Sequence, residues 1–249
     1  MNRLVLSCAA LASLLVVTSC DNDRKATKEN PEASKHTALT KVVKADDSAV
    51  QFQKGDWVKL RYTGSFTADP VEIVQRILRI EEANDKKKVT MGIHMKRGSE
   101  EKRFLQITDG SYESRRSGLP DEVIEIDAEG KETKLKMLKE QDLIRLWKWT
   151  LPSGIGGKPR NMKSNKVAVV IGQQTFQCNE ERGESDLDKK VVHLAFRQCK
   201  DFVWFKAPSE VKVADGSVIW QADVVAFGSA ADFPKEAPVA PKAEATPEK

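Results

Sequence analysis

Apolar and polar residues alternate along most of the chain from about residue 50 onward. In residues 56–63, the side chains of Val58, Leu60 and Tyr62 point to one side of an extended backbone, and the polar residues between them point to the other. A strand with one buried and one solvated face is typical of an antiparallel sheet. The same alternation predicts further strands at residues 72–80, 89–95, 103–108 and 121–136.

The last third of the chain returns to this pattern after one segment with helical spacing. That segment is residues 140–149, where Leu143, Leu146 and Trp147 fall on one side of a helix and a proline follows. A strand through Leu146 and Thr150 is the alternative. Later strands are predicted at residues 167–171, 175–179, 191–198, 204–205 and 217–227. We therefore expect a mostly β single domain with minor helix, built as a curved antiparallel sheet that is half-barrel-like or forms a sandwich.

The first nineteen residues have a different layout. A basic start ends at Arg3, an apolar stretch follows over residues 4–17, and the small residues Thr18 and Ser19 close it. This layout is typical of a cleavable signal peptide over residues 1–19. Because the apolar stretch is shorter than the roughly 20 residues that span a bilayer, a permanent transmembrane helix is not expected.

Cys20 follows the signal peptide directly. The run Val17-Thr18-Ser19-Cys20 resembles the lipobox of bacterial lipoproteins. The resemblance implies that signal peptidase II cuts before Cys20 and that Cys20 carries diacylglycerol and acyl chains such as palmitate, which anchor the protein in a membrane. It implies a cell-envelope location, on the periplasmic face of the inner or outer membrane or on the cell surface. Asp21 fits the pattern that retains enterobacterial lipoproteins in the inner membrane. The alternative is a secreted protein with a chance cysteine near its cleavage site.

Three segments make up the rest of the chain. Residues 20–49 are polar and contain no Phe, Trp or Tyr, which is typical of a flexible tether. Residues 229–249 hold four of the ten prolines among alanine, lysine and glutamate, which indicates a disordered tail. Residues 50–228 lie between them, and about 180 residues are enough for one domain with a substantial core.

The charge of the chain is nearly balanced. It has 41 basic and 37 acidic residues, a formal charge of +4, and removal of the signal peptide takes away only Arg3, which leaves +3. A nucleic-acid-binding protein normally concentrates a strong basic excess on one face. We therefore expect no nucleic-acid partner.

Three cysteines remain after cleavage. With Cys20 committed to lipid, Cys178 and Cys199 form an even pair in an oxidising compartment, which predicts a disulfide. Together with His193, these cysteines could instead supply three zinc ligands. Zinc ligands usually come in pairs about two to five residues apart, and these do not. The disulfide is therefore favoured, and no metal site is expected.

No catalytic motif occurs in the chain. The run from Gly154 to Pro159 is glycine-rich, but a phosphate-binding P-loop needs Ser or Thr where Pro159 stands and a glycine where Ser153 stands. A turn before the strand at 167–171 accounts for this run. Nucleophile elbows, zinc-protease helices and Ser-x-x-Lys nucleophiles do not occur either. We therefore expect neither a cofactor nor enzymatic activity, while a pair of carboxylates that meet only in space stays open.

Several runs resemble bacterial envelope proteins with half-barrel folds, which are related in shape to the carriers that move lipoproteins between membranes. The runs that carry the resemblance are Gly55-Asp56-Trp57-Val58, Ile171-Gly172-Gln173-Gln174-Thr175-Phe176-Gln177-Cys178, Trp204-Phe205-Lys206-Ala207-Pro208-Ser209-Glu210-Val211 and Asp215-Gly216-Ser217-Val218. The chain departs from the pattern at Ser217, where a second glycine is usual, and in having Cys199. The resemblance implies a half-barrel and, with it, cargo binding.

The concave side of such a sheet would be lined by its aromatic and methionine side chains. The residues expected there are Trp57, Tyr62, Met91, Met95, Trp204 and Trp220. A concave surface of this composition suits an apolar or lipidic ligand.

Three functions are consistent with these features. The first is a non-enzymatic envelope lipoprotein that binds an apolar or lipidic ligand, or a protein partner, on its curved sheet. A concave side filled by the protein's own side chains would argue against cargo. The second is a structural or assembly lipoprotein that docks a protein through an exposed sheet edge. The third is a hydrolase of envelope polymers, which needs a cleft with two facing carboxylates.

The predicted disulfide has a direct chemical test. Alkylation of the native protein without reduction should leave Cys178 and Cys199 unlabelled, and alkylation after reduction and unfolding should label both, as read by peptide mass spectrometry. Labelling of free thiols before reduction would contradict the disulfide and favour a metal site.

Overall fold

A computed structural model describes residues 50–83, 86–135, 146–152, 155–188 and 190–234. The predicted signal peptide, Cys20 and the tether lie outside the described residues. In the described part of the chain, no helix has both the length and the hydropathy that a bilayer crossing requires.

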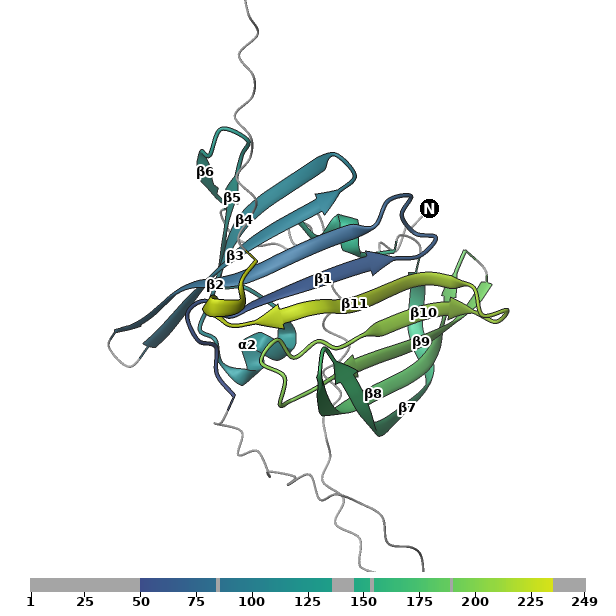
Figure 1. Ribbon diagram of the computed structural model, residues 1–249. Helices are drawn as coiled ribbons and strands as arrows, with labels where there is room; N and C mark the ends of the chain where they lie inside the picture. Colours follow the sequence, from purple (N-terminus) through teal and green to yellow (C-terminus); the bar gives the residue numbers. More distant parts are fainter. Residues whose placement is uncertain (1–49, 84–85, 136–145, 153–154, 189, 235–249) are drawn as a thin grey trace, which may run out of the picture.

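All strands of the described residues belong to one antiparallel sheet of eleven strands, in the order β6-β5-β4-β3-β2-β1-β11-β10-β9-β8-β7 (Figure 1). The strands of the first half are β1 (Trp57–Thr63), β2 (Val71–Ala83), β3 (Lys86–Arg97), β4 (Glu100–Thr108), β5 (Glu122–Ile126) and β6 (Glu132–Lys134). The strands of the second half are β7 (Ile155–Ile171), β8 (Gln174–Leu187), β9 (Lys190–Gln198), β10 (Ser209–Val213) and β11 (Val218–Gly228). The predicted fold class is confirmed, as an open curved sheet and not as a sandwich.

β1 joins the two halves of the sheet. Within each half, every strand pairs with its neighbour in the sequence, and β1 pairs in addition with β11. In that pairing Trp57 lies opposite Gly228 and Thr63 lies opposite Gln221. The register shifts between Lys59 and Leu60, which marks a bulge.

One face of the sheet is apolar, and we call it the inner face. On β1 it carries Val58, Leu60 and Tyr62, as the alternation predicts. The strand register places Ile73 of β2 and Met95 of β3 in the same row as Leu60. Further buried side chains of this core come from both halves: Ile77, Met91, Ile93, Phe104, Val123, Val192, Leu194, Val211 and Trp220. Since each large apolar side chain stabilises by about 1.5–3 kcal/mol when buried, this core supplies most of the drive to fold.

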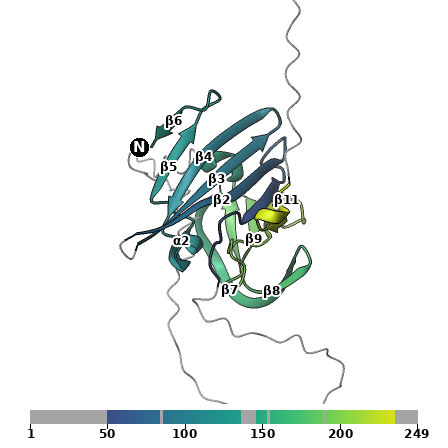
Figure 2. The same cartoon turned by 60° about the vertical axis from the view of Figure 1, so that its left-hand side comes forward.

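The sheet is so strongly curved that its far end returns toward its middle. Seen from the side, β7 and β8 curl below the first half (Figure 2). The ring centroids of Phe176 on β8 and Phe227 on β11 lie 6.3 Å apart, and Phe202 contacts both at 5.2 and 5.1 Å. This aromatic trio therefore ties the β7–β8 hairpin to β11 across the curve.

The pattern of alternation does not predict α2 (Tyr112–Ser117), which lies between β4 and β5. The side chain of Ser111 accepts a hydrogen bond from the backbone N–H of Ser114 at 3.1 Å and caps the helix, and Gly118 ends it with a φ of 64°. The helix buries none of its residues, so it leaves no periodic signal. Its capping serine and terminal glycine are the signal that could have revealed it.

Residues 199–208, between β9 and β10, form a packed loop, so the predicted strand at 204–205 is wrong. Trp204 lies in a turn, and Phe205 has a positive φ of 64°, which a strand does not allow. The ring of Phe205 packs edge-on against Tyr112 of α2 at 5.5 Å. Packing against α2 explains Phe205, and packing against Phe52 explains Trp204, so neither reflects strand pairing.

The predicted turn at residues 154–159 is also wrong in most of its length. Gly154 lies outside the described residues, and β7 begins at Ile155, which pairs with Leu187 of β8. The register shifts twice near Arg160, so the strand is irregular there. Gly156 also pairs with β8, opposite Asp186, and composition alone does not reveal this pairing.

The predicted helix at residues 140–149 is described only at its end. Residues 140–145 lie outside the described part, Leu146 and Trp147 are helical, and η1 (Lys148–Thr150) continues them as a 3-10 turn. The described residues therefore follow the helical prediction and not the alternative strand.

The first residues of the predicted tail belong to the folded part. η2 (Ala230–Asp232) follows β11, and the indole N–H of Trp57 donates to the carbonyl oxygen of Ser229 at 3.0 Å. The ring of Phe233 packs edge-on against Trp57 at 5.6 Å and lies 4.2 Å below the guanidinium of Arg76. The remainder of the tail, from residue 235, lies outside the described residues.

Candidate functional site

Four of the six side chains predicted to line a ligand site lie on the inner face. Tyr62 and Trp220 contact each other, with ring centroids 5.9 Å apart, and Met91 and Met95 share the inner side of β3. All four are at most 9% exposed. Burial raises the pKa of Tyr62 to about 12. The structure therefore brings these residues together as part of the core.

The other two predicted lining residues lie elsewhere. Trp57 is on the opposite face of β1 from Tyr62, where it is covered by Phe233. Trp204 is in the loop after β9, where its ring packs against Phe52 at 5.0 Å. The alternation places Trp57 one residue out of phase with Val58, which could have assigned it to the other face.

Residues 146–150 cover part of the inner face. Trp147 packs edge-on against Phe104 at 5.6 Å. Trp149 lies under two cations, since Arg97 and Lys102 sit 4.7 and 4.4 Å from its ring centroid. The indole N–H of Trp220 donates to the carbonyl oxygen of Thr150 at 2.7 Å. Among the predicted ligand-lining side chains, Trp220 is thus bound directly by this segment.

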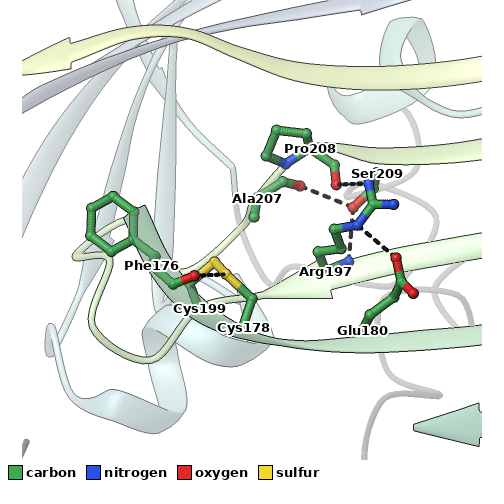
Figure 3. Close-up of a disulfide and its surroundings, with 8 residues drawn as sticks. All are labelled: Phe176, Cys178, Glu180, Arg197, Cys199, Ala207, Pro208 and Ser209. Atoms are coloured by element: carbon green, nitrogen blue, oxygen red, sulfur yellow. Dashed lines mark hydrogen bonds and ion pairs between the residues drawn. A yellow bond between two sulfur atoms is a disulfide. The ribbon is translucent and has the colours of Figure 1, made fainter. Parts of the chain in front are cut away.

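The predicted disulfide between Cys178 and Cys199 is present (Figure 3). The two cysteines lie directly opposite each other because Asn179 of β8 pairs with Gln198 of β9. Both are fully buried. Closing a loop of this size stabilises the fold by about 3 kcal/mol in the chain-entropy estimate. Because both sulfurs are consumed, the alternative zinc site with His193 does not hold.

Glu180 is the only buried carboxylate among the described residues. It lies two residues beyond Cys178 and opposite Arg197, whose Nε donates to it at 2.7 Å, and Arg182 donates to its other oxygen. Arg197 also donates to the carbonyl oxygen of Pro208 at 3.0 Å (Figure 3). The hydrogen bond from Arg182 lowers the pKa of Glu180 most, and the hydrogen bond and positive charge of Arg197 lower it further, so this pKa lies below its ordinary value. Glu180 is therefore ionised and committed to structure, and it does not serve as a general acid.

The two described histidines lie at the surface. His94 Nε2 is 3.1 Å from Glu101, which also pairs with Lys96 and Arg103; hydrogen bonds, first from Lys96 and then from His94 and Arg103, lower the pKa of Glu101 to about 2. His193 is exposed on β9. In the described part of the chain, no three His, Cys, Asp or Glu side chains gather in a way that could hold a metal ion.

The two ends of the sheet differ strongly. β6 has three residues and is a short end strand, whereas β7 at the opposite end has seventeen. Only β8 pairs with β7 among the described strands. A long end strand presents unpaired backbone groups that can bind another extended chain.

The register of the β7–β8 hairpin shows which backbone groups of β7 are free. The hairpin turns through two residues, Gly172 and Gln173, with Gly172 at φ 60°, so Ile171 and Gln174 are the hydrogen-bonded pair next to the turn. Hydrogen-bonded and non-bonded pairs then alternate along the strand. The residues whose N–H and C=O point away from β8 are Ser164, Lys166, Ala168 and Val170. We call this row the open edge.

The side chains of the open edge are also exposed. All four of its residues are exposed, and Val170 is 67% exposed, the largest value among the exposed large apolar side chains of the described residues. Val167, Val169 and Ile171 alternate with them and are more buried. Sequence reasoning found a strand at 167–171 but could not place it at the end of the sheet, because strand order depends on pairings distant in sequence.

No family model matches the chain, and no curated protein matches it. It is similar to a solved structure from Bacteroides fragilis, provisionally described as an exported protein with a YmcC-like fold, at 8% identity and a TM-score of 0.37, over 73% of this chain and 100% of that one. A structure from Parabacteroides distasonis, provisionally described as a lipoprotein, has 6% identity and a TM-score of 0.35, over 71% and 96%. MucB has 10% identity and a TM-score of 0.36, over 76% and 58%. MucB has also been solved in complex with MucA(peri). These identities do not assign the chain to a family.

The Glu180 cluster predicts a pH-dependent stability. Because the folded state lowers the pKa of Glu180 from its ordinary 4.5, its contribution is complete above about pH 4.5 and is lost as the pH falls through the lowered value. Glu180→Gln should lower the free energy of unfolding at pH 7 by about 3 kcal/mol, since Arg197 loses its charged partner. It should also flatten the decline in stability below pH 4.5, measured by urea unfolding at several pH values.

The exposed turn residue Glu129 provides the matched control for this change. Glu129→Gln should leave both the stability at pH 7 and the acid decline unchanged. Equal effects of the two substitutions on the free energy of unfolding would show that the ion pairs of Glu180 do not stabilise the fold.

Proposed function

We propose that this protein is a non-enzymatic, membrane-anchored lipoprotein of the bacterial envelope that docks a protein partner by adding a strand of the partner to β7. The observation that carries this proposal is the open edge, a row of outward backbone groups on exposed residues of the long end strand. Strand addition needs little else from the site, because backbone hydrogen bonds supply the affinity and neighbouring side chains supply the specificity.

The predicted anchor suits a docking role. Cys20 would fix the chain to the membrane, and a flexible tether of about 30 residues has a root-mean-square span of roughly 30 Å. The folded part could then reach partners at or near the bilayer surface. A partner confined to the same membrane would meet β7 at a raised local concentration.

Binding of an apolar cargo has less support from the structure. The inner face holds the apolar side chains that such a ligand needs, but residues 146–150 pack on it through Trp147, Trp149 and the bond from Trp220. A ligand there would have to displace this cover. The hydrolase alternative has less support still, because Glu180 is held by two arginines.

The anchor is tested by Cys20→Ala. The wild-type protein should fractionate with membranes and show the mass of diacylglycerol and acyl chains on the peptide that begins at residue 20. The variant should lose this mass and keep its signal peptide attached, because signal peptidase II cuts before the lipidated cysteine. A wild-type peptide without the lipid mass would rule out lipid anchoring through Cys20.

The docking mode is tested by photocrosslinking in cells that express the protein natively. A photoreactive amino acid at position 170 should give one dominant protein adduct. Ala168→Pro should abolish it, because proline removes an outward N–H of the open edge without removing a hydrogen bond to β8.

Glu132→Pro on β6 is the matched control. The bonds from Leu135 N to Val123 O and from Asp127 N to Lys131 O alternate so that the N–H of Glu132 points away from β5. This variant makes the same change at the other end of the sheet and should keep the adduct. An adduct that survives Ala168→Pro would exclude strand addition at β7.

A further inference from the structure

The charges near the open edge show what kind of segment can bind there. Two residues in the irregular part of β7, before the regular pairing that begins at Lys163, already have acidic partners on β8. Arg160 donates to both carboxylate oxygens of Asp186, at 2.8 and 3.0 Å, and the side-chain amide of Asn161 donates to Glu184 at 3.0 Å. Because Asp186 balances the charge of Arg160, that part of β7 offers no unbalanced positive charge to a partner.

Lys163 and Lys166 differ from Arg160 in this respect. In the described part of the chain, neither lysine has a carboxylate within ion-pair distance. The residue opposite Lys163 on β8 is Arg182, itself bound to Glu180, and the residue opposite Lys166 is Asn179. Both lysines are exposed. The open edge thus carries one such lysine, Lys166, and Lys163 lies directly beside it, so this part of β7 has two positive charges without an ion-pair partner on β8.

These charges argue against a second copy of this chain as the occupant. Two β7 strands paired edge to edge would bring four unbalanced lysines into one narrow strip, and lysine on an end strand is a usual means of preventing self-association. The same charges favour an acidic strand, because opposite charges across a strand pair are stabilising and like charges are destabilising.

The spacing of these side chains fixes the pattern of the bound segment. Lys163 and Lys166 are three residues apart and therefore point to opposite faces of the strand, whereas Val170 is four residues from Lys166 and shares its face. A segment that pairs with all three needs carboxylates three positions apart, one on each face. It needs an apolar side chain four positions from the carboxylate that faces Lys166.

We propose that the occupant of the open edge is an extended acidic segment of another protein, with carboxylates beside Lys163 and Lys166 and an apolar side chain beside Val170. This inference rests on the proposed function and specifies its partner. The segment would span residues 163–170 of β7, which is roughly 23 Å at about 3.3 Å per residue.

The inference is tested with two synthetic peptides of alternating threonine and valine. One carries glutamate at the two positions described above and the other carries lysine there. By fluorescence anisotropy, the glutamate peptide should bind the full mature chain at least about tenfold more tightly than the lysine peptide at low salt, and the difference should shrink near 0.5 M salt. Equal binding of the two peptides would overturn the inference.

Charge-reversal variants separate this inference from the proposed function. Lys163→Glu combined with Lys166→Glu should invert the peptide preference and remove the native photocrosslink from position 170. The control, Lys54→Glu combined with Lys88→Glu, makes the same change in net charge at exposed sites and should alter neither.

Two further outcomes are decisive. If Ala168→Pro removes the native adduct and charge reversal at Lys163 and Lys166 does not, docking at β7 stands and the acidic partner is wrong. If light scattering shows a dimer of the wild-type chain that Ala168→Pro dissociates, the occupant is a second copy, and the acidic partner is again wrong.

Discussion

The pairing of β1 with β11 is the constraint on which the rest of the structure depends. Every other ladder of the sheet joins strands that are neighbours within one half, so the first and second halves would otherwise be two separate meanders. Residues 57–63 and 221–228 lie near opposite ends of the folded chain, and their ladder brings the ends together in the middle of one sheet. The entropic cost of closing so long a loop grows only slowly with its length. We expect the formation of the β1–β11 ladder to be slow, because the chain loses the entropy of closing this long loop before the contacts of the ladder stabilise it.

Once the two halves share one sheet, their apolar faces become one continuous inner face that has to be covered. Curvature does part of this, since the aromatic trio of Phe176, Phe202 and Phe227 holds the β7–β8 hairpin against β11. Residues 146–150 cover another part of the inner face. Trp147 packs on Phe104, Trp149 lies under two cations, and Thr150 accepts a hydrogen bond from Trp220. The four predicted ligand residues on the inner face, Tyr62, Met91, Met95 and Trp220, are at most 9% exposed in this arrangement.

The strongest local restraints lie next to the strand that we assign to docking. β8 is fixed to β9 by the buried disulfide and by the Glu180 cluster, whereas β7 pairs with β8 alone among the described strands. A stiff neighbour keeps the backbone of β7 extended and in register, so an incoming strand would find its hydrogen-bonding groups already aligned. Preorganisation of this kind raises affinity by reducing the ordering that binding requires. The structure thus connects a stabilising feature, the Cys178–Cys199 bond, to the proposed site by way of one strand.

The sequence by itself determined the features that depend on local pattern. Alternation identified most of the strands, including the inward Val58, Leu60 and Tyr62 of β1, and the cysteine count identified the disulfide. Prediction from the sequence failed where the position of a side chain depends on contacts with residues distant in the chain. Trp204 and Phe205 look like a strand but fill a loop against Phe52 and α2, and Trp57 looks like a ligand platform but lies under Phe233. Only the tertiary structure decided that β7 is an end strand and that the inner face is covered. Strand order and curvature arise from pairings between distant segments, and no local period in the sequence encodes them.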